Sequence, residues 1–505
     1  MSNPLASGLT LGELCAILRD FDATLSGGAD VTVLDVDQDS RSIGPGALFA
    51  ARHGGKTDGL RYVADAARRG AVAVMVDAGA RVPELARCPI LRVRDVARAL
   101  PFAAEAVHGY PSRELQLVGM TGTNGKTTTT WLVQRVLEEL GVRCARLGTL
   151  GFEMAGHKDD THLTTPEADG ISRSLSLARR LGGTHAVMEV SSVALASHRV
   201  EALDFEVAAF SNLTHDHLDF HGTFDAYRDA KARLFTALSP RTAVLNVDDP
   251  FGQWLSENTT ARVVRVGMGE QDDVCGRELS ALPSGVTGPL SVHGQRIELR
   301  TRFVGRHNAE NLMLAMGILT TLGVDPERAA AALADVEPVP GRLERCDGPG
   351  DDCIVLVDYA HTPDALERVL AALSPASGRT LCVFGCGGDR DPKKRFPMGR
   401  AAGEGSAFAI LTNDNPRSES PERIAEEVER GLRSVGASYE VCLDRAQAIE
   451  RAVSLAQPGD VVLIAGKGHE TYQLVGGATL PFDDRLEARA ALGRRRALHS
   501  AEAAR

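Results

Sequence analysis

One glycine-rich segment constrains the fold of this chain more than any other part of it. Residues 119–130 read GMTGTNGKTTTT and lie between an apolar stretch, LQLVGM, and a stretch with helical character. Glycines permit the tight turn that points successive N–H groups inward, and the N-terminus of the following helix adds partial positive charge. Such a loop cradles phosphate, so the sequence predicts the opening βα unit of a nucleotide-binding domain.

The spacing of this loop departs from the strict Walker A pattern. That pattern requires glycine at position 120, where the chain has Met120, and the nearest glycines are Gly119 and Gly122. The flanking strand and helix still favour phosphate binding over an incidental turn. We expect Lys126 to reach the β- and γ-phosphates of ATP and the hydroxyl of Thr127 to bind Mg²⁺. The loop alone does not say what the ATP is used for.

The alternation of strands and helices predicts an α/β protein of three domains, since 505 residues are too many for one compact domain. Proline- and glycine-rich breaks at Tyr110-Pro111-Ser112 and near residues 337–341 suggest a first domain that ends at residue 112. We expect a P-loop-type parallel sheet in the central domain, a doubly wound, Rossmann-like C-terminal domain and a polar tail that frays. The predicted domains are 1–112, 113–338 and 339–505. Strands are expected at 31–36, 71–77, 89–93, 186–190, 207–210, 243–246, 353–358, 381–384, 408–412 and 461–465.

Composition excludes several classes of protein. A net charge of -11 argues against a nucleic-acid partner, which would call for a basic surface. The chain has no run of 18 apolar residues, so no membrane insertion is expected. The nine cysteines form no paired CxxC motifs, which argues against zinc. The N-terminus lacks the basic and apolar regions of a signal peptide, so we expect a cytoplasmic protein, acting as a monomer.

Polar residues with possible metal and phosphoryl-transfer chemistry follow the later strands. Glu189 ends the apolar stretch THAVMEV, where side chains of a parallel sheet face the ligand crevice. His215, Asp216 and His217 crowd into NLTHDHLD, and Lys231 lies on a predicted helix, YRDAKARLF. Taken singly, these features have ordinary explanations: a strand-end glutamate is more often a cap, and a helical lysine is usually solvated.

Taken in order, the motifs resemble those of the Mur ligases of peptidoglycan synthesis. The resemblance covers nearly the whole chain, from Asp39-Ser40-Arg41 to Asp483-Asp484-Arg485. It implies an ATP-dependent ligase that forms an amide bond through an acyl-phosphate. The motifs that carry it are GTNGKTTT, MEVSS, SNLTHDHLDFHG, YRDAKARLF, GRHNAEN (305–311), VPGRLE (339–344), DYAHTPDAL (358–366), GCGGDRD (385–391), DNPR (414–417) and GKGHE (466–470).

The resemblance implies a catalytic centre made of Lys126, Glu189, His217 and Lys231. It assigns Mg²⁺ binding to Glu189 and His217, beside Thr127, and a CO₂-derived carbamate on Lys231 to a second Mg²⁺. Mg²⁺ favours oxygen ligands, so a carbamate explains why a lysine lies in a metal site. The implied ATP contacts are Gly122, Thr123, Asn124, Gly125, Lys126, Thr127, Thr128, Asn308 and Arg342.

The DNPR segment resembles the signature of family members that add meso-diaminopimelate to the γ-carboxyl of D-Glu in UDP-MurNAc-L-Ala-D-Glu. Arginine suits this amino acid because a guanidinium can clamp its distal carboxylate bidentately. The resemblance implies that Glu470 binds the distal ammonium of this amino acid and that Arg390 helps to bind one of its carboxylates. The implied diaminopimelate contacts are Arg390, Asp414, Asn415, Pro416, Arg417, Gly466 and Glu470. The implied UDP-MurNAc-dipeptide contacts are Ser40, Arg41, Gly55, Lys56, Thr57, Thr164, Thr165, Ser191, Ser197 and Arg199.

Some residues depart from the family pattern and leave alternatives open. Val193 and Ser197 stand where related enzymes commonly carry His and Gln, and His162-Leu163 replaces an Asn-bearing version. One alternative is a sibling ligase, such as a folylpolyglutamate synthetase or the next Mur enzyme, which DNPR and GKGHE disfavour. Another is a catalytically silent Mur-like protein, and a third is a P-loop ATPase motor that would hydrolyse ATP without either co-substrate.

Overall fold

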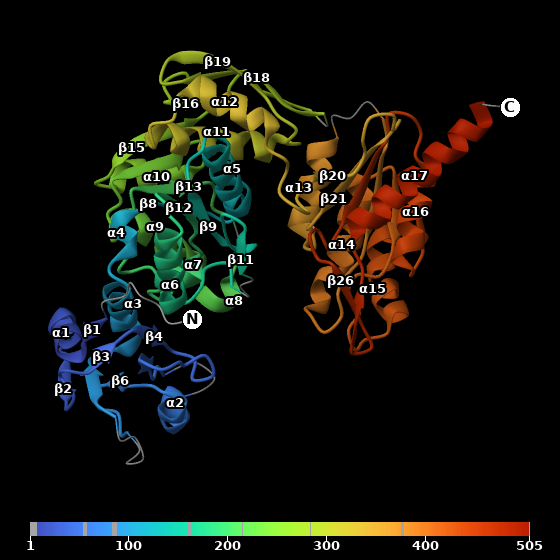
Figure 1. Ribbon diagram of the computed structural model, residues 1–505. Helices are drawn as coiled ribbons and strands as arrows, with labels where there is room; N and C mark the ends of the chain where they lie inside the picture. The colour runs from blue at the N-terminus through green and yellow to red at the C-terminus, as the bar shows by residue number, and fades with distance from the viewer. Residues whose placement is uncertain are drawn as a thin grey trace. The chain divides into compact units, whose positions relative to one another are not determined.

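Two compact units make up the chain in the computed structural model. The structure describes residues 8–53, 58–82, 88–159, 163–214, 216–282, 284–374 and 378–503. The first unit comprises Met1–Arg277, Leu290–Ile297 and Glu310–Ala332. The second comprises Glu278–Pro289, Glu298–Ala309 and Leu333–Arg505. Both are built from sheets covered by helices (Figure 1).

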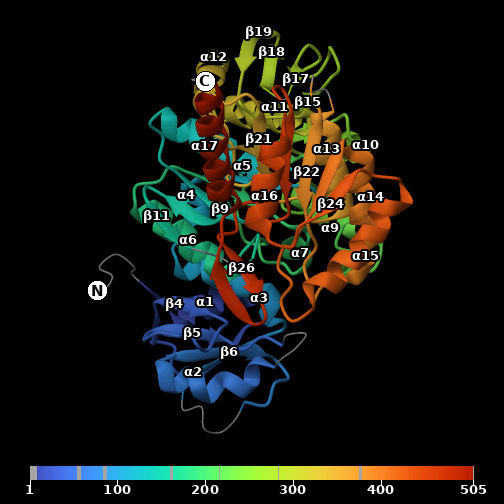
Figure 2. The same ribbon diagram turned by 90° about the vertical axis from the view of Figure 1, so that its right-hand side faces the viewer.

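A small sheet opens the first unit. Its elements are α1 (Leu11–Ile17), β2 (Thr24–Ser26), β3 (Thr32–Val33), β4 (Asp35–Asp37), β5 (Ala47–Ala50), α2 (Val63–Arg69), β6 (Ala73–Asp77), β7 (Ile90–Val93) and α3 (Val96–Val107). The strand order is β2-β7-β6-β5-β4, parallel except for β2. Helix α2 packs on one face, and α1 and α3 pack on the other (Figure 2). The strands predicted at 71–77 and 89–93 are confirmed, whereas 31–36 forms two short strands.

The larger sheet of the first unit carries the glycine-rich loop. Its elements include β8 (Gln116–Thr121), α5 (Lys126–Glu139), β9 (Cys144–Gly148), β10 (Gly151–Met154), β11 (His157–Asp159), β12 (His185–Glu189), β13 (Val207–Phe210), β14 (Thr242–Asn246), β15 (Arg262–Gly267) and β16 (Val274–Cys275). The order is β11-β10-β9-β12-β8-β13-β14-β15-β16, and the sheet continues with the antiparallel strands β18 (Gly285–Val292) and β17 (Ser280–Leu282). The strands from β9 to β16 are parallel, but β10 and β11 are antiparallel. The predicted parallel sheet is therefore mixed at this edge, because two residues join β9 to β10 and a parallel crossover needs far more chain.

The register of the central strands brings the predicted site residues to one edge. Strand β8 lies between β12 and β13, and Met120 pairs with Glu189 while Thr121 pairs with Phe210. Parallel strands end at the same edge of a sheet, which is where α/β proteins bind ligands. The glycine-rich loop, Glu189 and the segment after β13 therefore gather at this edge.

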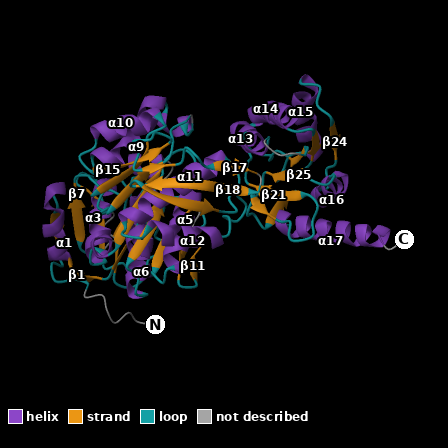
Figure 3. Ribbon diagram, turned by 90° about the horizontal axis from the view of Figure 1, so that it is seen from above, coloured by secondary structure: helices purple, strands orange, loops and turns teal. Residues whose placement is uncertain are grey.

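The second unit contains a doubly wound sheet, as predicted. Its elements are β20 (Glu344–Arg345), β21 (Ile354–Asp358), α13 (Pro363–Leu373), β22 (Thr380–Phe384), α14 (Arg395–Gly405), β23 (Phe408–Leu411), α15 (Pro421–Ser434), β24 (Tyr439–Val441), α16 (Arg445–Leu455), β25 (Val461–Ala465), β26 (Tyr472–Val475), β27 (Ala478–Pro481) and α17 (Asp484–Ala503). The order β20-β21-β25-β22-β23-β24 is parallel apart from β20. Helices α13, α14 and α15 cover one face, and α16 and α17 cover the other (Figure 3).

One local prediction is wrong and another gains detail. The segment Tyr110-Pro111-Ser112, predicted as a linker, leads into a helical turn, α4 (Pro111–Glu114), in which the buried Ser112 hydroxyl donates to Glu105 at 2.7 Å. The tail predicted to fray is helix α17, because Ala488, Ala491 and Leu492 form an apolar face that packs into the core. The break at 337–341 is confirmed as a loop between α12 (Pro326–Asp335) and β20. None of the described helices combines the length and apolar character needed to cross a bilayer.

Candidate active site

The phosphate loop, residues 122–125, requires glycine at both ends. Gly122 and Gly125 have φ values of 144° and 88°, which other residues rarely adopt. A Cβ at Gly122 would lie 1.9 Å from Oγ of Ser211, and one at Gly125 would lie 2.3 Å from Oδ1 of Asn311. The loop therefore turns tightly against neighbouring side chains and leads into α5 at Lys126.

Residues after β13 hold the phosphate loop in place. The N–H of Thr123 donates to the carbonyl of Asn212 at 2.8 Å, and the N–H of Asn124 donates to the Asn212 side chain at 3.0 Å. The Ser211 hydroxyl donates to the carbonyl of Asn124 at 2.5 Å. Both residues belong to the motif SNLTHDHLDFHG, but the sequence alone predicted no role for Ser211 or Asn212.

Lys126 curls back over the phosphate loop. Its ammonium donates to the carbonyls of Gly122 and Thr123 at 2.8 and 2.9 Å. Thr127 and Thr128 follow in the first turn of α5 and are almost fully buried. The predicted phosphate contacts therefore occupy one continuous turn at the end of β8.

Glu189 and Thr127 are in direct contact, as their predicted shared site requires. The Thr127 hydroxyl donates to Oε2 of Glu189 at 2.9 Å. Thr149, for which the sequence predicted no role, donates its N–H to Oε1 at 2.8 Å and its hydroxyl to Oε2 at 3.2 Å. Glu189 is buried, and these donors hold its carboxylate in one orientation.

Three of the residues predicted to contact the UDP-MurNAc-dipeptide form a hydrogen-bonded network at the end of β12. They are Thr165, Ser191 and Arg199. The Thr165 hydroxyl donates to the carbonyl of Glu189 at 2.9 Å and accepts from the Ser191 N–H at 2.9 Å. Arg199 donates to the carbonyl of Thr165 at 2.9 Å and pairs with Glu167 at 2.6 Å. Thr164 accepts a hydrogen bond from Thr149 at 3.2 Å. Ser197 lies at the C-terminal end of α7 (Ser192–Ala196), between Ser191 and Arg199 in the chain.

Lys231 is buried on α9 (Phe224–Thr236), where its Nζ donates to the carbonyl of Gly122 at 2.8 Å. Burial, followed by the charge of Lys126, lowers the pKa of Lys231 well below its usual value, and Asp216 offsets this only in part. Such a lysine is poised to be neutral.

Tyr227 connects Lys231 with His217 and the phosphate loop. Nζ of Lys231 lies 4.7 Å from the centre of the Tyr227 ring, and the centres of the His217 and Tyr227 rings are 6.4 Å apart. Its hydroxyl is 2.8 Å from the hydroxyl of Thr123, and burial raises the pKa of Tyr227 to about 12. His217 has φ 51° and a half-exposed side chain. Tyr227 is the first residue of the motif YRDAKARLF, but the sequence alone predicted no role for it.

The N-terminal sheet places two of the predicted UDP contacts. Ser40 is buried, whereas Arg41 is exposed and pairs bidentately with Asp39, with Nη2 2.6 Å from Oδ2. An exposed pair of this kind contributes little to stability, so Arg41 can exchange its partner at low cost. The predicted contacts Gly55, Lys56 and Thr57 lie outside the described residues.

The DNPR loop, residues 414–417, packs against the GCGGDRD loop in the second unit. Nη1 of Arg417 donates to the carbonyl of Gly388 at 2.7 Å. A Cβ at Gly388 would lie 2.0 Å from the carbonyl oxygen of Pro416, so only glycine permits this approach. Hydrogen bonds from Ser418, followed by the charges of Arg417 and Arg390, lower the pKa of Asp389. Both predicted carboxylate-binding arginines therefore act on the same small region.

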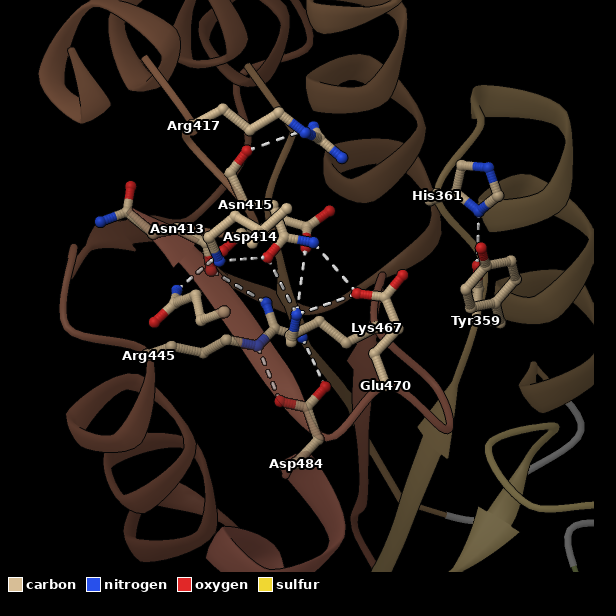
Figure 4. Close-up of polar contacts among 12 residues, drawn as sticks. Tyr359, His361, Asn413, Asp414, Asn415, Arg417, Arg445, Lys467, Glu470 and Asp484 are labelled. Carbon is tan, nitrogen blue, oxygen red and sulfur yellow. Dashed lines mark hydrogen bonds and ion pairs between the residues drawn. The ribbon is translucent and has the colours of Figure 1, made fainter. Parts of the chain in front are cut away.

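Lys467 lies at the centre of the other predicted diaminopimelate contacts. Its buried ammonium donates to Oε2 of Glu470 at 3.1 Å and to Oδ1 of Asn415 at 3.2 Å, and it lies 3.8 Å from Oδ1 of Asp414 (Figure 4). Asn415 in turn donates to Glu470 at 3.0 Å. Lys467 belongs to the motif GKGHE, but the sequence alone predicted no role for it. Gly466, with φ 121°, precedes it at the end of β25.

Arg342 and Asn308 belong to the second unit. The Arg342 guanidinium lies over the Tyr359 ring at 4.8 Å, and the Tyr359 ring stacks on His469. Burial raises the pKa of the neighbouring Asp358 carboxyl, which accepts from two backbone N–H groups. Asn308 is buried and donates to the carbonyl of Val304 at 2.8 Å. Their predicted contact with ATP stays a prediction.

Three family models and several curated relatives match this chain. Residues 35–108 match the Mur ligase family, catalytic domain; residues 120–319 match the Mur ligase middle domain; and residues 341–468 match the Mur ligase, glutamate ligase domain. The UDP-N-acetylmuramoyl-L-alanyl-D-glutamate--2,6-diaminopimelate ligase of Geobacillus thermodenitrificans is 40% identical over 97% of this chain and 100% of that protein. The protein of the same name from Solibacter usitatus is 43% identical over 96% of this chain and 98% of its own length.

Solved structures share the α/β architecture over most or nearly all of the chain. A structure of UDP-N-acetylmuramoyl-L-alanyl-D-glutamate--2,6-diaminopimelate ligase has a TM-score of 0.72 and 32% identity, covering 97% of this chain and 99% of that chain. The folylpolyglutamate synthase of Mycobacterium tuberculosis has a TM-score of 0.57 at 18% identity, covering 78% of this chain and 94% of that chain. This second likeness shows a shared fold alone. With three matching domain models and relatives aligned over almost its full length, the chain belongs to the Mur ligase family.

Proposed function

We propose that the chain is an ATP-dependent ligase that adds meso-diaminopimelate to the γ-carboxyl of D-Glu in UDP-MurNAc-L-Ala-D-Glu during peptidoglycan synthesis. The observation that carries the choice of amino acid is the set of charges on and beside the DNPR loop. Arg417 and Arg390 both act on Asp389, and the Asp414 and Glu470 carboxylates lie beside Lys467. An amino acid with both a distal carboxylate and a distal ammonium complements these groups. The printed names of the relatives support the same substrates.

The chemistry begins with a carboxylate that is a poor electrophile. Its oxygen attacks the γ-phosphorus of ATP, and the bond between that phosphorus and the β-phosphate oxygen breaks. ADP departs, and the carboxylate has become an acyl-phosphate. The amine of meso-diaminopimelate then attacks the acyl carbon, and inorganic phosphate leaves as the amide forms and the amine loses a proton. Lys126, at the phosphate loop, offsets negative charge on the transferring phosphoryl group.

The first unit offers oxygen ligands that suit Mg²⁺. The Thr127 hydroxyl and the Glu189 carboxylate touch beside the phosphate loop, and Mg²⁺ is commonly bound by one or two carboxylates together with phosphates. When bound there, Mg²⁺ supplies positive charge that stabilises the transferring phosphoryl group. Within the described residues, no cluster of three His, Cys, Asp or Glu side chains is arranged to hold a metal. His217 as a further ligand is part of the proposal.

Lys231 is proposed to carry a carbamate. Its burial and lowered pKa favour the neutral amine, which can attack the carbon of CO₂. The new N–C bond forms, one C=O electron pair moves to oxygen, and the nitrogen releases a proton to solvent. The product is an anion with oxygen donors, which suits a magnesium site in a way that an ammonium does not.

The remaining assignments complete the proposal. Thr164, Thr165, Ser191, Ser197 and Arg199 bind the acceptor dipeptide, and the N-terminal sheet binds UDP through Ser40, Arg41 and the segment Gly55, Lys56 and Thr57. Asn308 and Arg342 contact ATP. Domain boundaries lie near residues 112 and 338, and the protein acts as a cytoplasmic monomer.

A panel of amino acids tests the proposed function. Purified protein is incubated with UDP-MurNAc-L-Ala-D-Glu, ATP, Mg²⁺ and each amino acid, and the product is identified by mass. We expect tripeptide only with meso-diaminopimelate, together with phosphate release that requires both co-substrates. Equal use of lysine would contradict the arginine clamp. Phosphate release without either co-substrate would indicate an ATPase, and no turnover at all would indicate a silent member of the family.

A further inference from the structure

A second buried ion pair lies directly behind the proposed amino-acid site. Arg445 and Asp484 are both fully buried, and Nε and Nη2 of Arg445 each donate to one Asp484 oxygen at 2.7 Å (Figure 4). Arg445 is the first residue of α16, and Asp484 is the first residue of α17. The substrate assignments above use neither residue, although Asp484 lies in the DDR segment near the end of the family resemblance.

Arg445 also connects two loops that carry proposed substrate contacts. Its Nη1 donates to the carbonyl of Asn413 at 3.1 Å, and its Nη2 donates to the carbonyl of Ala465 at 3.0 Å. These carbonyls follow β23 and end β25, which the sheet order separates by β22. The next residue after each carbonyl is a proposed diaminopimelate contact, Asp414 in one loop and Gly466 in the other.

The side chains around this junction are closely packed. A Cβ at Gly466 would lie 3.7 Å from Oδ2 of Asp414 and 3.9 Å from Nη2 of Arg445. Burial opposes the charge of Arg445, but Asp484, and then the Asp414 and Glu470 carboxylates, raise its pKa on balance. Arg445 is therefore linked to the amino-acid site both through the backbone and through charge.

The chemistry of the Arg445–Asp484 pair suits it to positioning the loops that it contacts more than to stabilising the fold. Apolar residues of similar volume can replace a buried ion pair without loss of stability, whereas the planar guanidinium fork fixes several acceptors in one geometry. Arg445 uses that fork for four hydrogen bonds, two to Asp484 and two to backbone carbonyls. A lysine at this position would have one nitrogen and could not hold both loops in the same way.

We propose that Arg445 is a positioning residue which, oriented by Asp484, sets the relative position of the loops bearing Asp414 and Gly466 and thereby the affinity for meso-diaminopimelate. This inference rests on the proposed function, because it concerns the amino-acid substrate of that ligase. Arg445 does not touch the substrate; it acts through the two carbonyls.

The test is to measure the KM for each of the three substrates in the Asp484→Asn and Arg445→Lys variants. We expect the KM for meso-diaminopimelate to rise by about 10-fold or more in both, as for groups that orient direct ligands, with smaller changes in kcat. The KM values for ATP and for UDP-MurNAc-L-Ala-D-Glu should change by no more than about twofold, because their proposed contacts are elsewhere. If Asp484→Asn does not fold, Arg445→Lys carries the test, since it keeps the buried charges balanced.

Two other ion pairs of α17 provide matched controls. Arg495 donates to both carboxylate oxygens of Asp352, at 2.8 and 3.0 Å, and to the carbonyl of Val453 at 2.9 Å, so its bonding resembles that of Arg445. Asp352→Asn should lower the melting temperature without raising the KM for meso-diaminopimelate. Arg494, which joins α17 to Glu450 of α16 at 2.9 Å, is half-exposed, and Arg494→Gln should change neither quantity.

The outcomes separate the inference from the proposed function. Folded Asp484→Asn and Arg445→Lys proteins with an unchanged KM for meso-diaminopimelate would overturn the inference alone. The same would follow if Asp352→Asn raised that KM equally, because the effect would then reflect general stability. A wild-type protein that forms no product with meso-diaminopimelate would overturn the proposed function and the inference with it.

Discussion

Two buried lysines, one in each compact unit, lie in opposite electrostatic surroundings. Lys231 and Lys467 are 1% and 0% exposed. Lys467 is surrounded by acceptors, with Glu470 at 3.1 Å and Asp414 at 3.8 Å. Lys231 instead donates to a backbone carbonyl, and burial and Lys126 lower its pKa. A lysine among carboxylates orients them, whereas a lysine with a lowered pKa is available as a nucleophile.

The difference matches the two tasks that we propose for the units. The first unit handles phosphate and carbamate, and its side chains meet through the backbone of a glycine loop. The second unit holds an amino acid between fixed charges. Damage to the first should therefore stop the reaction with any amino acid, while damage to the second should change which amino acid is used and how tightly.

Lys126→Ala should have the largest effect. Loss of the ammonium that offsets phosphoryl charge should lower kcat on the order of 10³-fold, to near the limit of detection. The measurement is product formation at saturating concentrations of all three substrates. Lys158→Ala, which changes an exposed lysine on β11, serves as the control and should retain full activity. Near-normal turnover of Lys126→Ala would refute the assignment of the phosphate loop.

Lys231→Arg tests whether Lys231, unlike Lys467, acts by forming a carbamate. Arginine keeps a positive charge but cannot form the carbamate, so we expect kcat to fall on the order of 10²-fold. Wild-type protein equilibrated with bicarbonate should show a mass gain of one CO₂ under native conditions, and the variant should not. An active Lys231→Arg protein would show that a cation suffices at this position.

Arg417→Ala should act on the amino acid alone. Removal of the clamp should raise the KM for meso-diaminopimelate by roughly 10²-fold, as for other losses of a charge-assisted hydrogen bond, and leave the KM for ATP unchanged. Arg433→Ala, on the exposed face of α15, is the control and should leave both constants unchanged. A parallel loss of ATP affinity in Arg417→Ala would contradict a selective clamp.

The sequence predicted site residues that belong to a local motif, and it missed residues whose contacts lie far away in the chain. The glycine loop and the strand ends carry local signals, so Lys126, Glu189 and the DNPR loop were located correctly on their elements. Thr149 and Tyr227 were missed as site residues because they reach Glu189 and Thr123 only through tertiary packing, over 40 and 104 positions. No local pattern marks such a contact.

The errors in secondary structure have more local causes. Helix α17 was expected to fray because many arginines obscure its short apolar face of Ala488, Ala491 and Leu492. The antiparallel edge formed by β10 follows from a connection too short for a crossover, which strand periodicity alone does not reveal. Arg445 and Asp484, 39 positions apart, likewise gave no signal of their pairing.

The smallest expected effect is a change in the free energy of unfolding when either buried lysine is replaced by methionine. It tests the comparison of the two lysines most directly. Because the folded-state pKa of Lys231 lies below its unfolded value, the unfolded chain binds more protons between those two pKa values, and stability rises with pH across that window. Lys231→Met should therefore raise the free energy of unfolding at neutral pH in CO₂-free buffer, and its advantage should shrink towards pH 10.5, the usual lysine value. Lys467→Met should lower it by about 2 kcal/mol, because Glu470 and Asp414 lose their buried partner.

Each lysine needs a probe of its own unit, since two compact units need not unfold together. Trp131 and Trp254 both lie in the first unit, so tryptophan fluorescence during chemical denaturation follows Lys231→Met. Hydrogen exchange of the β22 and β25 amides follows Lys467→Met. Stabilisation by both substitutions, or by neither, would show that the two lysines experience the same balance of burial and charge, and the division of labour drawn between them would then be wrong.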